Sequence, residues 1–131
     1  MELTTDLTYL AWSAALCAVL WMPYAFERIF NWGLVDAVGY PENPPEAAKW
    51  AQRAQRAHLN MVENLAVFAA LVLVAHAAGA ANAMTALGAT LFFWGRVGHA
   101  VIFIIGIPWL RTLAFFIAWI GLLLIFLQII T

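Results

Sequence analysis

Apolar residues along the chain fall into four long runs, separated by short stretches rich in glycine, proline and asparagine. A run of about 20 apolar residues is long enough to cross a bilayer as a helix. One sizeable loop, residues 31–45, and two short turns near Gly79 and Pro108 separate the runs. This pattern predicts an all-α membrane protein, a four-helix up-down-up-down bundle. The expected spans are residues 7–30, 46–78, 83–105 and 109–130.

Prolines refine two of these elements. Pro23 lies inside the first span and predicts a kink, because proline removes a helical hydrogen bond. Pro45 is followed by Glu46, and this pair is typical of a helix start, where a carboxylate is favoured by the helix dipole. We therefore expect the second long helix to begin near Glu46.

Composition supports the membrane assignment and narrows the function. Two-thirds of the 131 residues are apolar, a tenth are charged and the mean hydropathy is +0.88, so a single integral membrane domain is expected. A net charge of −1 argues against nucleic acid as a partner. The lone Cys17 excludes an internal disulfide.

The basic residues indicate how the chain crosses the membrane. Four of them flank the first loop: Arg28, Lys49, Arg53 and Arg56. Both termini carry none. The positive-inside rule then places the first loop and the turn near Pro108 in the cytoplasm, with both termini outside. The compact size suggests a bacterial inner membrane.

One polar face interrupts the second apolar run. Arg56, Asn60 and Glu63 are spaced at i, i+4 and i+7 and therefore share one side of a helix. A carboxylate at membrane depth is costly unless protein or water meets it. We therefore expect another part of the protein to cover this face.

Further cations lie at similar depth on the other helices. Arg28 closes the first span, Arg96 and His99 lie in the third, and Arg111 opens the fourth. We expect these charges to gather in the cytoplasmic half, with an outer half that is nearly all hydrocarbon. An excess of arginine favours an anion-binding site, because the guanidinium presents a planar fork to carboxylates.

Structural roles explain several of the same residues. Arg28, Lys49 and Arg53 can extend to the lipid headgroups. Arg96 can pair with Glu63 as a lock between two helices. In this interpretation His99 is a buried core residue and Arg111 anchors its helix at the membrane interface. His58 and His76 lie away from the polar face, and the histidine spacings do not predict a metal site.

Three stretches together resemble one known family. They are R-A-H-L-N-M-V-E-N at 56–64, G-R-V-G-H at 95–99 and P-W-L-R-T at 108–112. They resemble the MAPEG family, the membrane-associated proteins in eicosanoid and glutathione metabolism, and the microsomal glutathione transferases in particular. The resemblance covers nearly the whole chain.

The resemblance implies a homotrimer that binds glutathione between neighbouring subunits and receives a lipophilic substrate from the membrane lipids. The implied reaction is transfer of glutathione to an electrophile or reduction of a lipid hydroperoxide. Arg111 would stabilise the thiolate, because a cation lowers a thiol pKa, and Thr112 would donate a hydrogen bond to the sulfur. The residues implied to bind glutathione are Arg28, Arg56, Asn60, Glu63, Arg96 and His99, with Glu63 accepting from the α-amino group.

Three residues depart from the pattern of the eicosanoid-type members. Leu59 stands where an arginine is found, and Phe103 and Phe115 stand in place of tyrosines. Phenylalanine donates no hydrogen bond, so these changes weaken the expected contacts with glutathione. The alternative is a non-catalytic member of the family that binds lipid or another anionic ligand. A transporter fits less well, because the chain shows no internal repeat.

Overall fold

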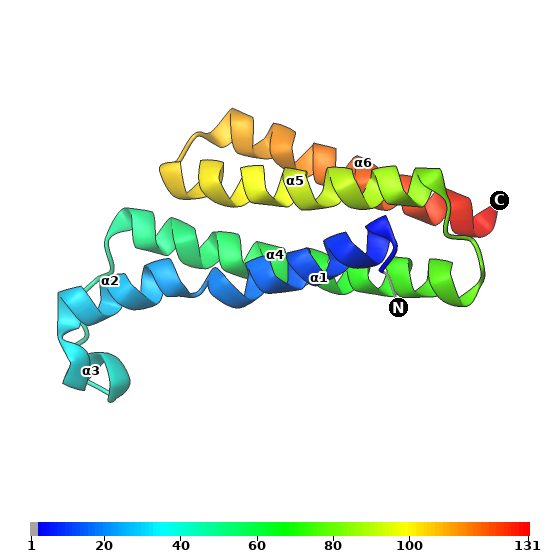
Figure 1. Cartoon of the computed structure of the whole chain (residues 1–131). Helices are drawn as coiled ribbons and strands as arrows, with labels where there is room; N and C mark the ends of the chain where they lie inside the picture. The colour runs from blue at the N-terminus through cyan, green and yellow to red at the C-terminus, as the bar shows by residue number, and fades with distance from the viewer. Residues whose placement is uncertain (1–2) are drawn as a thin grey trace.

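The computed structural model describes residues 3–131, which form six helices (Figure 1). Four helical segments are long and apolar enough to cross a membrane: Thr5–Trp32, Lys49–Ala77, Ala83–Ile105 and Pro108–Ile130. The helices are α1 (Thr5–Val19), α2 (Met22–Trp32), α3 (Leu34–Val38), α4 (Lys49–Ala77), α5 (Ala83–Ile105) and α6 (Pro108–Ile130). The predicted all-α bundle of four spans is confirmed.

The first span is two helices. Leu20 and Trp21 form a turn between α1 and α2, and Pro23 lies in the first turn of α2. Proline is tolerated in a first turn because the N–H that it lacks would have no helical partner there. The break therefore occurs where Pro23 predicts a kink.

The loop between the first two spans is more ordered than its turn residues suggest. It contains the short helix α3, which the sequence did not predict. Gly33, with φ of +82°, separates α2 from α3. The next span begins at Lys49 rather than near Glu46, because Ala48 is extended and its N–H donates to the Glu27 carboxylate.

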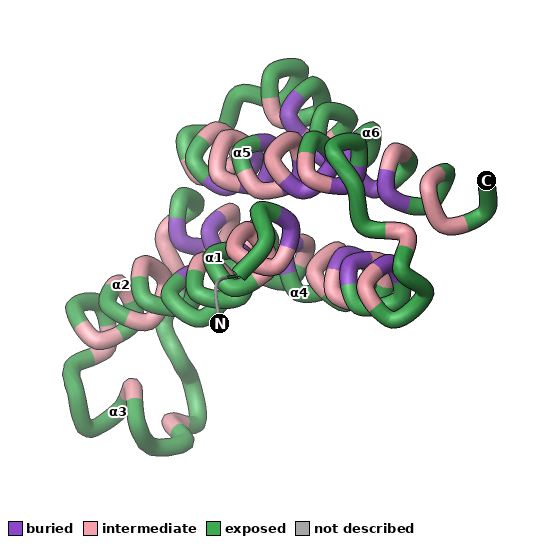
Figure 2. The backbone as a smooth tube through the Cα atoms, turned by 45° about the vertical axis from the view of Figure 1, so that its right-hand side comes forward, coloured by how far each residue is buried: buried purple, intermediate pink, exposed green. Residues whose placement is uncertain are grey.

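Close contact between α5 and α6 depends on small residues. A Cβ on Gly121 would lie 2.3 Å from the carbonyl oxygen of Gly88, and a Cβ on Gly95 would lie 2.8 Å from the backbone nitrogen of Ala118. Glycine is therefore needed at these crossings. Buried residues lie along the facing sides of the helices (Figure 2).

The apolar core joins α4 to the α5–α6 pair. Phe68 of α4 stacks on Phe92 of α5 with ring centroids 4.0 Å apart, and Ile125 of α6 is fully buried. Helix α1 packs on α4 and α5. This core fixes the position of α4 along the axis of α5, and so determines which polar residues of the two helices meet.

Candidate functional site

Arg96 of α5 is the most deeply buried cation of the bundle. Its side chain is 1% exposed, and its Nη2 donates to the Oδ1 of Asn60 on α4 over 2.7 Å. Asn64 Nδ2 donates to the Asn60 carbonyl oxygen over 2.8 Å. Nε and Nη1 of Arg96 are buried without a hydrogen-bond partner. The α4–α5 interface therefore carries an arginine held mainly by one amide.

Glu63 does not make the ion pair with Arg96 that the sequence allows. Glu63 is exposed on α4, whereas Arg96 points to Asn60, three residues earlier. Across residues 3–131 the structure contains one salt bridge, and it involves neither residue. Glu63 thus faces away from the subunit's own core.

A pocket of about 330 Å³ lies between α4, α5 and α6. It brings together four of the expected site residues: Asn60 and His99, expected to bind glutathione, and Arg111 and Thr112, expected to activate its thiol. We call it the Thr112 pocket. Its remaining walls are aromatic and are formed by Phe103, Phe115 and Phe116.

The aromatic rings hold the polar groups of this pocket in place. The Arg111 guanidinium carbon lies 4.5 Å from the centre of the Phe103 ring, a cation–π distance. The His99 ring lies 5.4 Å from the Phe103 ring, edge to face. His99 is buried, and its Nδ1 has no partner. The Thr112 hydroxyl donates to the Pro108 carbonyl oxygen over 3.1 Å, so it must rotate before it can donate to a ligand.

A second pocket, of about 210 Å³, adjoins the turn between α5 and α6. It is lined by Arg53, Arg56, Phe103, Gly106, Pro108 and Arg111, and we call it the Arg53 pocket. The two pockets share Phe103 and Arg111. Among residues 3–131, no carboxylate lines either of them, so both are electropositive.

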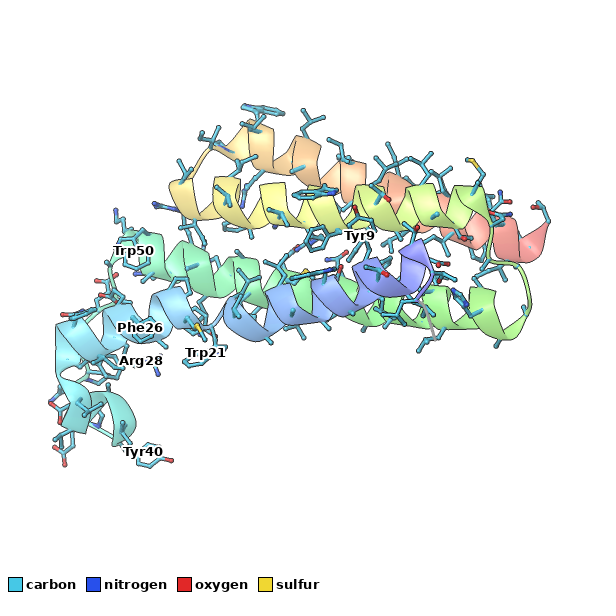
Figure 3. The ribbon with its side chains drawn as sticks, viewed as in Figure 1. Tyr9, Trp21, Phe26, Arg28, Tyr40 and Trp50 are labelled. Carbon is cyan, nitrogen blue, oxygen red and sulfur yellow. The ribbon has the colours of Figure 1, made fainter. Side chains whose placement is uncertain are left out.

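Arg28, another residue expected to bind glutathione, lies away from both pockets. Arg28 is exposed on α2, with its guanidinium carbon 4.8 Å from the Trp32 ring. Figure 3 shows it on α2, on the side of the molecule opposite α6. The chain therefore brings Asn60, Arg96, His99, Arg111 and Thr112 together and places Arg56 in the adjoining pocket, while Arg28 and Glu63 lie outside.

A buried polar cluster lies at the opposite end of the bundle, in the half that was expected to be nearly all hydrocarbon. Asp6 is 3% exposed, and its Oδ2 lies 3.0 Å from His76 Nε2 and 3.3 Å from the donating hydroxyl of Thr85. The three residues come from α1, α4 and α5. In the sequence, Asp6 has the pattern of an exposed acid in the first turn of a helix. Its burial results from the packing of three helices, which the sequence pattern does not show.

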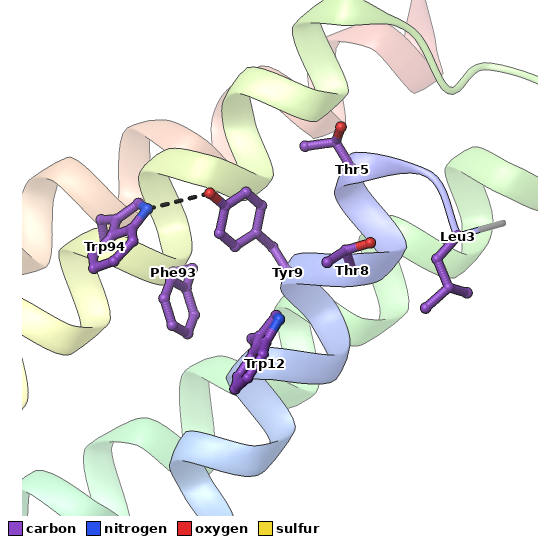
Figure 4. Close-up of a pocket in the computed structure, with 7 residues that line it drawn as sticks. All are labelled: Leu3, Thr5, Thr8, Tyr9, Trp12, Phe93 and Trp94. Atoms are coloured by element: carbon purple, nitrogen blue, oxygen red, sulfur yellow. Dashed lines mark hydrogen bonds between the residues drawn. The ribbon is translucent and has the colours of Figure 1, made fainter.

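Sequence reasoning also missed a pocket of about 560 Å³ at that end, between α1 and α5 (Figure 4). Trp94 Nε1 donates to the Tyr9 hydroxyl over 3.3 Å across it. Its lining is aromatic and uncharged: Leu3, Thr5, Thr8, Tyr9, Trp12, Phe93 and Trp94. It therefore lacks the cations of the other two pockets.

The fold defines a helical integral membrane protein with two electropositive pockets between its spans. The model of the MAPEG family matches residues 9–131, nearly the whole chain, and the protein belongs to this family of membrane proteins of glutathione and eicosanoid metabolism. No curated protein and no solved structure matches the chain.

Proposed function

We propose that the protein is a membrane-embedded, glutathione-dependent enzyme that conjugates lipophilic electrophiles or reduces lipid hydroperoxides. The observation that carries the proposal is the Thr112 pocket, where Arg111, His99 and Asn60 surround a space without a carboxylate. Such a space favours an anion. Family membership makes glutathione the leading candidate for it.

Arg111 is the residue that would make glutathione reactive. A guanidinium held on the Phe103 ring lowers the pKa of a thiol placed beside it, because it stabilises the thiolate. Thr112 would donate a hydrogen bond to the same sulfur after rotating from Pro108.

In conjugation, the thiolate attacks an electrophilic carbon and forms a C–S bond, and the displaced or ring-opened group leaves with the electron pair. In peroxide reduction, the thiolate attacks the terminal oxygen and the O–O bond breaks. The lipid leaves as an alcohol, and a second glutathione reduces the resulting sulfenic acid to the disulfide and water.

Asn60 would present an amide donor to the ligand. Its Oδ1 accepts from Arg96, so its Nδ2 is left for the pocket. The Nε and Nη1 atoms of Arg96 have no solvent-accessible surface, so Arg96 would orient Asn60 rather than touch the ligand. His99 and Arg56 would bind the polar and carboxylate groups of glutathione.

The exposed side of α4 supports assembly into a homotrimer. Arg56 and Glu63 lie on a face that also exposes Leu59, Val62 and Val67. A charged face on an apolar span needs a protein partner. In a trimer a neighbouring subunit would cover this face, and Arg28 and Glu63 would complete a site between subunits.

We place the protein in a bacterial inner membrane, with the first loop cytoplasmic and both termini outside.

A second candidate is a non-catalytic family member that binds lipid or another anionic ligand. The observation that favours it is the aromatic lining of the Thr112 pocket, where Phe103 and Phe115 offer no hydroxyl to a ligand.

Glutathione titration of the detergent-purified protein tests the proposal. We expect saturable binding heat together with an increase in thiolate absorbance. Arg111→Ala should abolish the thiolate signal, because it removes the cation nearest the proposed sulfur position. Lys49→Ala is the matched control, because it removes a cation that lines neither pocket.

Two results would contradict this mechanism. If Arg111→Ala retained the thiolate signal and turnover, Arg111 would not be the activating residue. If the folded native protein bound no glutathione at millimolar concentration, the non-catalytic function would be favoured.

A further inference from the structure

We propose that the Arg53 pocket binds the oxyanion headgroup of an anionic amphiphile, a phosphate or carboxylate on an acyl chain. This ligand differs from glutathione, and its binding does not require the glutathione reaction, but it would compete with glutathione for Arg56 and Arg111. The proposal begins with Arg53, which the sequence suggests is only a cation that extends to the headgroups.

Arg53 is held in position by the end of α5. Its Nε donates to the Ile104 carbonyl oxygen over 3.0 Å, so the terminal nitrogens of the guanidinium remain for a ligand. Gly106 permits this arrangement in two ways. Its φ of +95° favours glycine, and a Cβ there would lie 3.0 Å from Arg53 Nε. The site is thus formed by packing as well as by charge.

Within the described residues 3–131, no acidic side chain forms an ion pair with the charges around this pocket. Arg53, Arg56 and Arg111 all line it, and no carboxylate does. The single salt bridge among residues 3–131 joins Asp6 to His76 near the other end of the bundle. The N-terminus of α6 also lies here, and no side chain caps it. Three guanidinium groups and a positive helix end together favour a phosphate or carboxylate.

Size and depth point to the headgroup of a lipid. A pocket of about 210 Å³ accommodates one phosphate or carboxylate group, but not a whole lipid. The pocket lies at the turn where α5 ends and α6 begins. In a pair of membrane-spanning helices, such a turn lies at the level of the lipid headgroups. Beside it, Ile107, Trp109 and Leu110 are exposed apolar residues, which an acyl chain can cover.

Lipid binding by the purified protein tests this inference. Dioleoylphosphatidylglycerol, dioleoylphosphatidylcholine, oleate and inorganic phosphate would each be titrated, and bound lipid measured by native mass spectrometry. We expect the anionic lipids to bind about a hundredfold more tightly than the zwitterionic lipid, because three arginines line the pocket and each nearby basic residue strengthens binding about fivefold.

Variants locate the binding. Arg53→Gln should weaken phosphatidylglycerol binding about fivefold, whereas Arg53→Lys should retain part of it. Lys49→Gln removes the same charge from the same helix but lies outside the pocket, and should change binding little. Circular dichroism would show that each variant is folded.

Each outcome decides one part of the proposal. If inorganic phosphate bound as tightly as phosphatidylglycerol and its binding depended on Arg53, the oxyanion site would be supported. The proposal that the oxyanion belongs to a lipid would then be wrong. Equal binding of the two phospholipids, or equal losses in Arg53→Gln and Lys49→Gln, would overturn the site itself. Loss of glutathione binding with lipid binding retained would contradict the proposed enzyme and leave this inference standing.

Discussion

Phe103 lies where the two electropositive pockets meet. Its ring carries the Arg111 guanidinium on one face and contacts the edge of His99. It therefore orients two residues of the proposed glutathione site without forming a polar contact itself. Its aromatic ring fixes the position of Arg111, but the absence of a hydroxyl limits what it offers a ligand.

Restoring hydroxyl groups in the Thr112 pocket should strengthen glutathione binding. Phe103→Tyr and Phe115→Tyr each add a donor to the lining, and a hydrogen bond contributes about 0.5–1.5 kcal/mol, or about two- to tenfold in Kd. Titration calorimetry with glutathione would measure the change.

Phe26→Tyr is the control for these substitutions. Phe26 is an exposed aromatic residue on α2, so the added hydroxyl faces away from the pocket. A similar gain in Phe26→Tyr, or no gain in either pocket variant, would place the ligand somewhere other than the Thr112 pocket.

Helical spacing explains why several residues of the candidate site could be found from the sequence. His99 follows Arg96 by nearly one turn, and Thr112 adjoins Arg111, so motifs on separate helices already limit the pocket. The partner of Arg96 could not be found in this way. Asn60 and Glu63 lie on the same helical face, and only the position of α4 along α5 determines that Asn60 is the partner of Arg96.

At the scale of elements, the distance between α5 and α6 increases toward the pockets. An added Cβ would meet α6 backbone at 2.6 Å on Gly88 and 2.8 Å on Gly95, but only a side chain at 3.8 Å on Gly98. The helices thus touch near the start of α5 and diverge toward its end (Figure 1).

This gradient predicts different effects for two similar substitutions. Gly88→Ala should destabilise the protein by about 1–3 kcal/mol, because the new methyl group would overlap the Gly121 carbonyl oxygen. Gly98→Ala should be neutral or slightly stabilising, because it meets only ordinary contact and favours the helix. Thermal unfolding in detergent would measure both, and equal losses would show that the separation does not change.

Turn chemistry predicted the helix break at Pro23 because proline acts locally. The start of α4 and the presence of α3 depend on tertiary contacts instead. Ala48 N–H donates to Glu27, and the Gln52 side chain donates to the Ala47 carbonyl oxygen, so the chain stays extended up to Lys49. Glu46 near a proline therefore gave the expected helix start three residues too early.

For the whole molecule, hydropathy alone was sufficient to predict four spans, because membrane helices are recognised by length and apolarity. Assembly is different, since it depends on which helical faces remain uncovered in one subunit. The exposed α4 face, with Glu63 among apolar neighbours, is the feature that supports a trimer.

A bulky residue on that face should separate the subunits. Val62→Trp places a large side chain beside Glu63 and should lower the fraction of trimer measured by sedimentation velocity in detergent. Val101→Trp, a similar change at an exposed position of α5, serves as the control. Unchanged assembly of Val62→Trp would show that α4 is not the interface.

The divergence of α5 and α6 has a consequence for lateral access from the bilayer. In residues 3–131, the one side-chain hydrogen bond from α6 to another element joins Gln128 to Asn82, near the far end from the pockets. The half of α6 that carries Arg111 and Thr112 is held by packing and by the cation–π contact of Arg111 with Phe103. Tilting this half about the tight crossing at Gly88 would break no side-chain hydrogen bond to another helix, so we expect an acyl chain to enter sideways from the lipid.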